Sequence, residues 1–435
     1  MDRKVEFSNK IMRNPIAKAM NLSYNKMNRY MFVQHERANA RQTTKKGQIC
    51  TMEQNEKKTL RIGLLGFGSM GKTHTWAVQN LPFFYGSIPF SAKVVGVCTT
   101  TEEKSNAIAA EFGMQIATTN EDDLINSPDI DIIDICTPNI YHYETLKKAI
   151  HAGKSVLCEK PLCISAEQAE EIAAIPLDEG QVCGMVFNNR WLAPVMRAKQ
   201  LIDEGKIGRI LSFEGKYLHN SATDVNRPAG WKQDSTICGG GVLFDLGSHV
   251  IDLLGFLCGH LTEVGGMSQI AYPTRIGRNG EEWETNADES FYLTGKTAEG
   301  ACGTITVGKL QVGTNDDLSF EIYGENGALR FSLMEPNWLY YYDNTAEASP
   351  IGGMRGFTKI ECVGRYPELT FPSQKAPAGW LYGHLESMHA FLSRVNDGNP
   401  FYPSLADGLY VQNVMETAYA SDQIGGLRME VPPCS

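Results

Sequence analysis

The chain has 435 residues, of which 42% are apolar and 21% charged, a composition that is typical of an ordered globular protein and excludes a fibrous or largely disordered chain. The formal net charge of −10 argues against nucleic-acid binding, and no apolar run approaches the roughly 20 residues needed to cross a bilayer. The eleven cysteines are odd in number and include no Cys-x-x-Cys pair, which favours a reducing, cytoplasmic location over a disulfide framework.

The chain begins with a basic leader. Residues 1–50 contain eleven Lys or Arg against three Asp or Glu, a charge of +8, so that the remainder carries −18. This segment shows no apolar period and no signal-peptide pattern, and Met52 follows it shortly before the first strand. We interpret residues 1–57 as an extension outside the folded protein, either disordered or produced by a misassigned start, with Met52 as the working start.

Residues 58–187 alternate between buried strands and helices. Strands are predicted at Leu60–Gly66, Lys93–Thr99, Ile130–Cys136, Ser155–Glu159 and Val182–Phe187. Helices are predicted at 69–80, 102–112, 141–152 and 166–174. Strands and helices that alternate at this spacing predict an α/β domain of the Rossmann type, built on a doubly wound parallel sheet.

The pattern changes after Asn188. A helix at Trp191–Glu204 precedes half-buried alternating strands at Ile210–Tyr217, Glu289–Thr294, Cys302–Val307 and Leu318–Tyr323. Two closing helices, His384–Val395 and Ser404–Ser421, are free to pack back on the first domain. Residues 188–435 are therefore expected to form an α+β domain with a large, mainly antiparallel, open sheet. No metal site is predicted, because His384 and His389 fall on different faces of their helix.

The turn after the first strand carries the glycine pattern of a dinucleotide-binding loop. In this pattern the first glycine permits the tight turn, the second lets the backbone approach a pyrophosphate, and the third lets the helix pack on the strand. The alternative is an ordinary tight turn between a strand and a helix. The residues expected to bind the cofactor are Gly66, Phe67, Gly68, Ser69, Met70 and Gly71.

Further cofactor contacts are expected at the carboxyl ends of the later strands, where ligands bind in such sheets. Candidate residues are Thr99, Thr137, Pro138, Asn139, His142, Glu159, Lys160 and Asn188. At the end of the second strand, Thr99 stands where an acid usually binds the ribose of NAD, and no arginine is adjacent to bind the phosphate of NADP. The cofactor is therefore either NAD or NADP, with NAD favoured.

Two segments carry candidates for proton and charge chemistry. Lys160, at a strand end, can donate a hydrogen bond to a substrate oxygen that gains negative charge; a surface lysine before a helix is the alternative. Asp245 and His249 lie four residues apart after three glycines, which on an α-helix places them on one face. The imidazole can accept a hydroxyl proton near neutral pH, with Asp245 orienting the ring or contacting substrate; a structural histidine is the alternative.

Taken in order, GFGSMG, TPN-x-x-His, EKP, NNRW (Asn188–Trp191), EGKIGRI (Glu204–Ile210) and GGG-x-x-x-D-x-G-x-H resemble the Gfo/Idh/MocA family of glucose–fructose and inositol oxidoreductases. The resemblance spans Leu60 to the end of the chain and departs from the family at Thr99. It implies a Rossmann domain, then an α/β domain whose open sheet forms contacts in a homodimer or homotetramer. It also implies that Lys160, Asp245 and His249 are catalytic.

The resemblance further implies a sugar-like substrate. Trp231 and Lys232 match a pair that lies beside the substrate in related enzymes, and Arg190, Tyr217 and His219 complete an expected rim. Taken singly, each of these five residues is also explained by a packing or surface role.

The expected activity is hydride transfer between the nicotinamide and a secondary hydroxyl of a sugar, glycoside or cyclitol. One alternative is a glycosidase-like elimination through transient C3 oxidation, and another is a cofactor-binding sensor or regulator.

Overall fold

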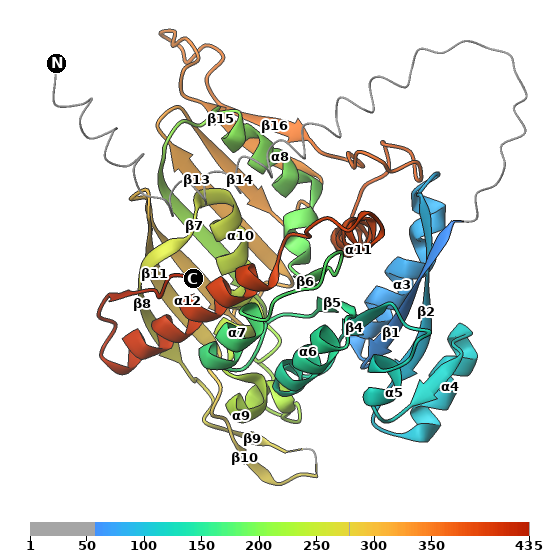
Figure 1. Ribbon diagram of the computed structural model, residues 1–435. Helices are drawn as coiled ribbons and strands as arrows, with labels where there is room; N and C mark the ends of the chain where they lie inside the picture. The colour runs from blue at the N-terminus through green and yellow to red at the C-terminus, as the bar shows by residue number, and fades with distance from the viewer. Residues whose placement is uncertain (1–56, 278, 435) are drawn as a thin grey trace, which may run out of the picture. The chain divides into compact units, whose positions relative to one another are not determined.

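The computed structural model describes residues 57–277 and 279–434 of the chain. The described residues form one compact unit. The expectations for the basic leader lie outside the described residues. The described part contains two large sheets, which Figure 1 shows one beside the other, and a two-stranded hairpin.

The first sheet has six parallel strands in the order β3-β2-β1-β4-β5-β6. Its strands are β1 (Lys58–Leu65), β2 (Phe90–Cys98), β3 (Ile116–Thr118), β4 (Ile132–Ile135), β5 (Ser155–Cys158) and β6 (Cys183–Met185). This is the strand order of a dinucleotide-binding Rossmann sheet, which confirms the predicted architecture. Strand β4 is buried at all four positions, as its largely apolar sequence predicts for a central strand, and Asp134 is its one charged residue.

The helices of this half are α3 (Ser69–Phe84), α4 (Glu102–Phe112), α5 (Asp122–Ile125), α6 (His142–His151) and α7 (Ala166–Ala173). Local sequence fixes several of their ends. The Thr101 side chain accepts a hydrogen bond from Lys104 N–H at the start of α4, and Gly113 ends the helix in the left-handed conformation. The Ser165 side chain accepts a hydrogen bond from Gln168 N–H at the start of α7, whose predicted range was 166–174.

A helix from near the end of the chain completes the core beside this sheet. Helix α11 (Trp380–Asp397) packs against α3, and its residues Leu385, Met388 and Phe391 share a buried cluster with Leu60 and Val78. The apolar face of α11 thus covers core residues that α3 and the sheet alone would leave exposed. It also brings distant residues to the carboxyl edge of the Rossmann sheet.

The second sheet has nine strands in the order β16-β15-β14-β13-β7-β12-β11-β8-β17. Neighbouring strands are antiparallel except for the parallel pair β7 and β12, which agrees with the expected mainly antiparallel sheet. The strands are β7 (Ile210–Leu218), β8 (Leu261–Gln269), β11 (Ser290–Thr297), β12 (Cys302–Gly308), β13 (Asp317–Gly324), β14 (Gly327–Ser332), β15 (Trp338–Asp343), β16 (Phe357–Glu361) and β17 (Met429–Glu430). A separate hairpin joins β9 (Thr274–Ile276) to β10 (Glu282–Glu284).

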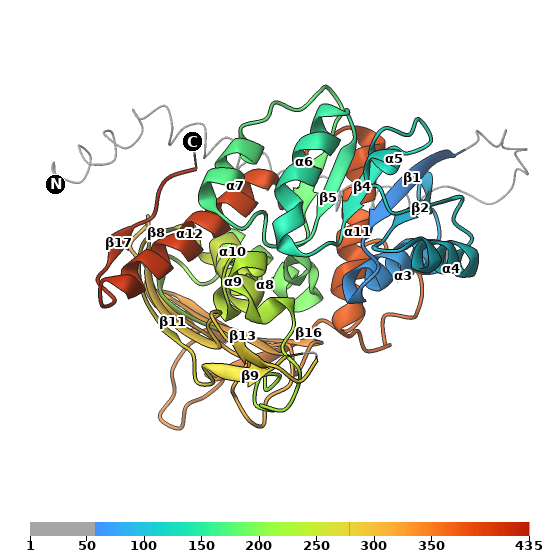
Figure 2. The same ribbon diagram turned by 90° about the horizontal axis from the view of Figure 1, so that it is seen from below.

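Helices lie on one face of this sheet, as Figure 2 shows. They are α8 (Ala193–Asp203), α9 (Ser235–Cys238), α10 (Ser248–Cys258) and α12 (Leu405–Gln423). The stretch Ser235–Cys258 is long and apolar enough to span a membrane by length and composition, but most of it is buried inside the protein, as in a core helix. In the described residues no helix covers the opposite face of the sheet.

Candidate functional site

The glycine turn between β1 and α3 is shaped for close backbone approach. Gly66 has φ +88°, and a Cβ there would lie 2.6 Å from the Cys136 carbonyl oxygen. A Cβ at Gly71 would lie 2.3 Å from the Gly66 carbonyl oxygen, which leaves room only for glycine. A Cβ at Gly68 would meet nothing within 4 Å, so the backbone there faces open space at the amino end of α3.

Beside this turn, two buried polar atoms from two strand ends have no hydrogen-bond partner, namely Thr137 Oγ1 after β4 and Asn188 Nδ2 after β6. Glu159, after β5, lines the cavity described below, and its Oε1 lies 3.3 Å from His74 Nε2. Burying an unpaired polar atom costs about 1–3 kcal/mol, so such a group at a strand end indicates a ligand partner. The residues present therefore fit a nicotinamide dinucleotide, with the glycine turn for its phosphates and these atoms for its nicotinamide half.

Two other predicted cofactor residues lie in structural positions. His142 is fully buried, and its ring nitrogens face the carbonyl oxygens of Pro161 and Thr137 at 2.8 and 3.0 Å, so the side chain ties the two loops together and is not exposed to a ligand. The Thr99 hydroxyl lies 2.8 Å from the Ser105 hydroxyl. The His142 ring thus has both nitrogens paired within the protein, which argues against its expected contact with the cofactor, whereas the expected contact of Thr99 stays a prediction.

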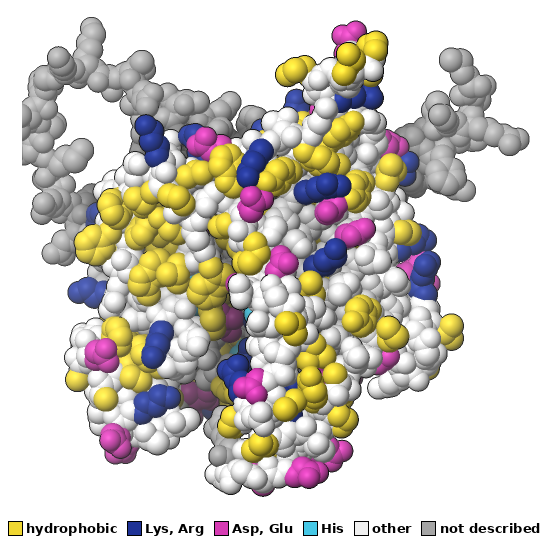
Figure 3. Space-filling model, turned by 180° about the vertical axis from the view of Figure 1, so that it is seen from behind, with side chains coloured by type: hydrophobic (Ala, Val, Ile, Leu, Met, Phe, Trp, Pro, Cys, Tyr) yellow, Lys and Arg dark blue, Asp and Glu magenta, His cyan; other side chains and the backbone are white. Residues whose placement is uncertain are grey.

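Between the two sheets lies a cavity of about 600 Å³, and the hollowed face in Figure 3 shows acidic, basic and histidine side chains inside it. The structure brings most of the predicted site residues to this cavity. Those that line it are Met70, Glu159, Lys160, Asn188, Tyr217, His219, Trp231, Lys232, Asp245 and His249.

Asp245 is held by three lysines. Its Oδ1 accepts from Lys160 Nζ at 3.1 Å and from Lys232 Nζ at 2.7 Å, and its Oδ2 lies 3.0 Å from Lys309 Nζ. Burial opposes ionisation of Asp245, but the three ammonium groups outweigh it and hold the pKa of this carboxyl well below its usual range. The expected role of Asp245 in orienting the His249 ring is not supported, because its carboxylate binds the lysines.

Asp245 lies in a π-helical turn, Leu243–Gly247, and not in the regular α-helix that the sequence predicts; such turns recur at functional sites. His249 follows in α10 and faces the same cavity. Its Nδ1 is buried without a hydrogen-bond partner, and its ring packs edge-on against Phe187 and Tyr217. Burial and the nearby Lys160 charge lower the pKa of His249 to about 3, so the ring is neutral. The sequence analysis expected the His249 imidazole to accept a proton near neutral pH. Burial of the ring corrects this expectation.

The far wall of the cavity is polar. Asp316 Oδ1 accepts a hydrogen bond from the Tyr217 hydroxyl at 2.7 Å and lies 2.8 Å from His219 Nε2. Trp231 and Lys232 lie in a short 3₁₀ turn at the mouth, with the Lys232 ammonium 5.6 Å from the indole centroid. These contacts give the cavity both hydrogen-bonding groups and an aromatic surface.

Arg190 does not reach this cavity, which corrects its predicted place on the substrate rim. Its guanidinium donates to Asp252 Oδ2 at 2.9 Å and to Asp407 Oδ1 at 2.8 Å, and its side chain is only 8% exposed. This buried ion cluster joins three segments that are far apart in the sequence, so Arg190 has a structural role.

Sequence reasoning missed several cavity residues. Lys309 follows β12, Asp316 precedes β13, and Trp380 and His384 begin α11. Both ring nitrogens of His384 are buried without a partner, although the residue lines the cavity. None of the four lies in a local motif, because each reaches the site only through the tertiary fold.

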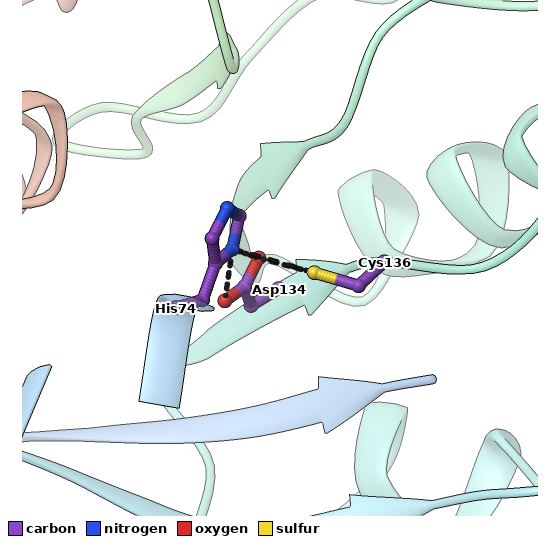
Figure 4. A group of neighbouring side chains, drawn as sticks. All are labelled: His74, Asp134 and Cys136. Atoms are coloured by element: carbon purple, nitrogen blue, oxygen red, sulfur yellow. Dashed lines mark hydrogen bonds and ion pairs between the residues drawn. The ribbon is translucent and has the colours of Figure 1, made fainter. Parts of the chain in front are cut away.

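In the described residues, one group of His, Cys, Asp or Glu side chains brings three ligand-type atoms within 4.8 Å of one another: His74, Asp134 and Cys136 (Figure 4). His74 Nδ1 lies 2.9 Å from both oxygens of Asp134 and 3.3 Å from Cys136 Sγ. These atoms already serve as hydrogen-bond partners for one another, so we describe the group as a hydrogen-bonded cluster.

Comparisons with known proteins agree with the fold. Residues 60–187 match the oxidoreductase family with an NAD-binding Rossmann fold, and residues 195–330 match the GFO/IDH/MocA C-terminal domain. Levoglucosan dehydrogenase of Pseudarthrobacter phenanthrenivorans is 31% identical over 369 residues, which cover 81% of this chain and 94% of that enzyme. Inositol 2-dehydrogenase of Rhizobium meliloti is 27% identical over 279 residues, covering 64% and 77%.

The solved structure of a levoglucosan dehydrogenase in complex with NADH and levoglucosan superposes with a TM-score of 0.82 at 30% identity and covers 86% of this chain and all of that one. The sheets described above, the two matched family domains and these relatives lead to one assignment. The chain belongs to the Gfo/Idh/MocA family of NAD-binding oxidoreductases.

Proposed function

We propose that the protein is an NAD-dependent dehydrogenase that oxidises a secondary hydroxyl of a sugar, anhydrosugar or cyclitol, or reduces the corresponding ketone. The observation that carries this proposal is the convergence of Lys160 and His249 on one cavity with Glu159 and Asn188 from the strand ends. The similarity to levoglucosan dehydrogenase and inositol 2-dehydrogenase supports the substrate class.

A bound nicotinamide would supply the hydride acceptor or donor. Lys160 then donates a hydrogen bond to the reacting substrate oxygen, and its charge stabilises the negative charge that develops there. His249 accepts the hydroxyl proton. Although burial makes this imidazole a weak base, the oxygen becomes a far stronger acid as the hydride leaves, so a neutral ring can take the proton late in the reaction.

The remaining cavity groups support a polyhydroxylated substrate. Asp316 accepts hydrogen bonds, Lys232 donates them and His384 can do either. Trp231 and Trp380 offer flat apolar surfaces. Pockets for polar small molecules combine such surfaces with a few convergent polar groups. A pyranose or cyclitol ring presents both kinds of surface.

NAD is proposed over NADP for two reasons. The hydroxyl of Thr99 faces Ser105, and the next helix begins with the acidic residues Glu102 and Glu103. Two carboxylates close to the end of β2 would repel the extra phosphate of NADP.

The test is a panel of sugars, glycosides, anhydrosugars and inositols assayed with NAD and with NADP by absorbance of the reduced nicotinamide. We expect turnover with NAD on at least one polyol. Lys160→Met and His249→Asn should each lower kcat by about 10²–10⁴-fold, the range for loss of a group that transfers or stabilises a proton. The exposed Lys93→Met and His151→Asn serve as matched controls. Unchanged kcat in both site variants would sink the proposed mechanism.

The same panel separates the alternative functions. Release of an aglycone without net reduction of NAD would indicate a glycosidase-like elimination. Tight binding of NAD with no turnover on any polyol would indicate a sensor or regulator.

We also propose that the protein is a cytoplasmic homodimer or homotetramer that associates through the helix-free face of the nine-stranded sheet. Met267 on β8 and Tyr292 on β11 are paired neighbours on that face, and both are exposed. Light scattering should give a mass of two or four chains, and Met267→Glu should reduce it, since a desolvated charge opposes association. A monomeric wild type would contradict the proposal.

A further inference from the structure

A buried line of charged groups runs from the interior of the Rossmann sheet to the cavity. His74 on α3 stands between two carboxylates: its Nδ1 lies 2.9 Å from Asp134 on β4, and its Nε2 lies 3.3 Å from Glu159 Oε1 after β5. Glu159 Oε2 accepts a hydrogen bond from the Lys160 backbone N–H at 3.2 Å. Figure 4 shows the His74 and Asp134 end of this line.

The mechanism proposed above does not use His74 or Asp134. Neither residue lines the cavity, and both side chains are at most 3% exposed. A buried ion group costs several kcal/mol of desolvation and is commonly matched by an apolar substitute. The other three residues of the buried strand β4 are isoleucines, so burial at this position favours an apolar side chain. A role beyond packing therefore explains why charge is placed there.

The charges along this line act together on the ionisation of Glu159. Burial disfavours the imidazolium form of His74, but Asp134 outweighs it and raises the pKa of His74 well above its ordinary value. Burial likewise opposes ionisation of Glu159, but the hydrogen bond and charge of His74 lower the pKa of Glu159 to about 2. Titratable groups that also act on or respond to Glu159 are Cys136, His142, Cys158, Lys160, Lys232, His249 and His384.

We propose that His74 and Asp134 are positioning residues that keep Glu159 ionised at the cavity wall, and that this fixed negative charge favours the bound oxidised nicotinamide over the reduced one. The oxidised ring carries a positive charge that the reduced ring lacks, so an adjacent carboxylate stabilises the two forms unequally. This inference rests on the proposed function, because it requires the nicotinamide to bind beside Glu159.

The test compares dissociation constants of NAD and NADH, measured by NADH fluorescence and by competition with NAD, from pH 6 to pH 9. The affinity ratio of the wild type should be flat in this range, since Glu159 stays ionised. In His74→Gln the pKa of Glu159 rises, so the preference for NAD over NADH should fall by at least about tenfold as the pH is lowered, because a unit charge within about 12 Å changes the affinity by that factor or more at an effective dielectric constant of about 20.

Three variants make the result specific. Glu159→Gln should give the low ratio at every pH, and the double variant with His74→Gln should match Glu159→Gln alone if His74 acts through Glu159. The exposed His151→Gln is the matched control and should behave as the wild type. A purely structural role for His74 would weaken NAD and NADH equally and leave their ratio unchanged.

A second measurement uses only the wild-type protein and does not depend on the folding of any variant. Nitrogen-15 NMR of histidine-labelled wild-type protein should show a doubly protonated imidazole at pH 8, and its absence would overturn the inference. If folded His74→Gln and the wild type have the same ratio of NAD to NADH affinity at all pH values, the inference about His74 is also overturned. The proposed function would then remain intact. Failure of both nucleotides to bind the wild type would remove both proposals together.

Discussion

At the scale of single residues, the partners of buried polar groups distinguish structural positions from functional ones. Arg190 has two carboxylates within hydrogen-bond distance and lies away from the cavity. Thr137, Asn188 and His384 each have a buried polar atom without a protein partner, and Asn188 and His384 line the cavity. Buried polar atoms are nearly always paired in native proteins, so these unpaired ones are expected to bind a ligand.

This distinction gives a prediction for Arg190. We expect Arg190→Gln to lower the free energy of unfolding by about 3–5 kcal/mol, because it leaves Asp252 and Asp407 buried without their cation. Urea denaturation measures this loss. The KM of the variant that remains folded should stay within about twofold of the wild type, since a residue outside the site does not alter substrate binding. A large rise in KM at unchanged stability would contradict the structural role of Arg190 and support its contact with the substrate.

At the scale of elements, the turn from β1 into α3 uses its glycines for two different purposes. Gly66 and Gly71 are needed for the fold, because a side chain at either would collide with backbone oxygen. Gly68 has φ −81° and free space around it, so alanine fits the protein itself.

We therefore expect Gly68→Ala and Gly71→Ala to separate cofactor binding from stability. Gly68→Ala should keep the wild-type Tm but weaken NAD binding at least about tenfold, because the methyl group takes the space of the pyrophosphate. Gly71→Ala should lower the free energy of unfolding by more than about 1 kcal/mol through steric strain. Thermal melts and NADH fluorescence titrations check both. Equal NAD affinity in Gly68→Ala and wild type would contradict the assignment of this turn.

The contact of α11 with the Rossmann half predicts a pH dependence of stability. Glu386 on α11 is buried and shares a short hydrogen bond with the Tyr85 hydroxyl. Burial, with the charge of Glu368, raises the pKa of Glu386 to about 7. The folded protein thus binds a proton that the unfolded chain, with a carboxyl pKa near 4.5, has released. The stabilisation is complete below about pH 4.5 and is lost as the pH rises through about 7.

Between pH 5 and pH 8 the free energy of unfolding should therefore fall more steeply in the wild type than in Glu386→Gln, by at most about 3 kcal/mol. Urea denaturation at both pH values measures the difference between the proteins. Glu111→Gln, an exposed change on α4, serves as the control and should parallel the wild type. Identical slopes for all three proteins would show that Glu386 does not titrate in this window.

At the scale of the whole folded unit, the Rossmann half depends on the end of the chain. The core beside α3 includes Phe391 and Leu392 of α11, together with Phe401 just after it. Without α11 the apolar surface that these residues cover would be exposed to water. Each Å² of exposed apolar surface lowers the stability by about 25 cal/mol.

A fragment of residues 57–187 should therefore fail to unfold cooperatively, as measured by near-UV circular dichroism on heating. Linking residues 376–401 to its end should restore a cooperative transition. A control fragment linked to the same segment with Phe391→Asp and Leu392→Asp should not recover, because the apolar contact is lost. Cooperative unfolding of the unlinked fragment would contradict the role given to α11.

The regular part of the fold follows closely from local sequence. Helix α4 has the predicted bounds 102–112, and the long alternating strands β7, β12 and β13 were all expected. Strand β3 has three residues and β9 and β10 belong to a short hairpin, so none of them is long enough to show a hydrophobic period. The π-helical turn at Asp245 was also missed, because one inserted residue changes the facing of side chains without changing composition.

The sequence by itself determined the order of elements, the dinucleotide turn and most of the predicted cavity residues, among them Lys160, Asp245 and His249. These depend on turn chemistry, buried apolar runs and motifs that are local in the chain. Only the tertiary structure decided that Lys309 and His384 join the cavity and that Arg190 leaves it. Long-range packing and charge pairing bring such residues together from distant segments, and no local pattern records which of them will meet.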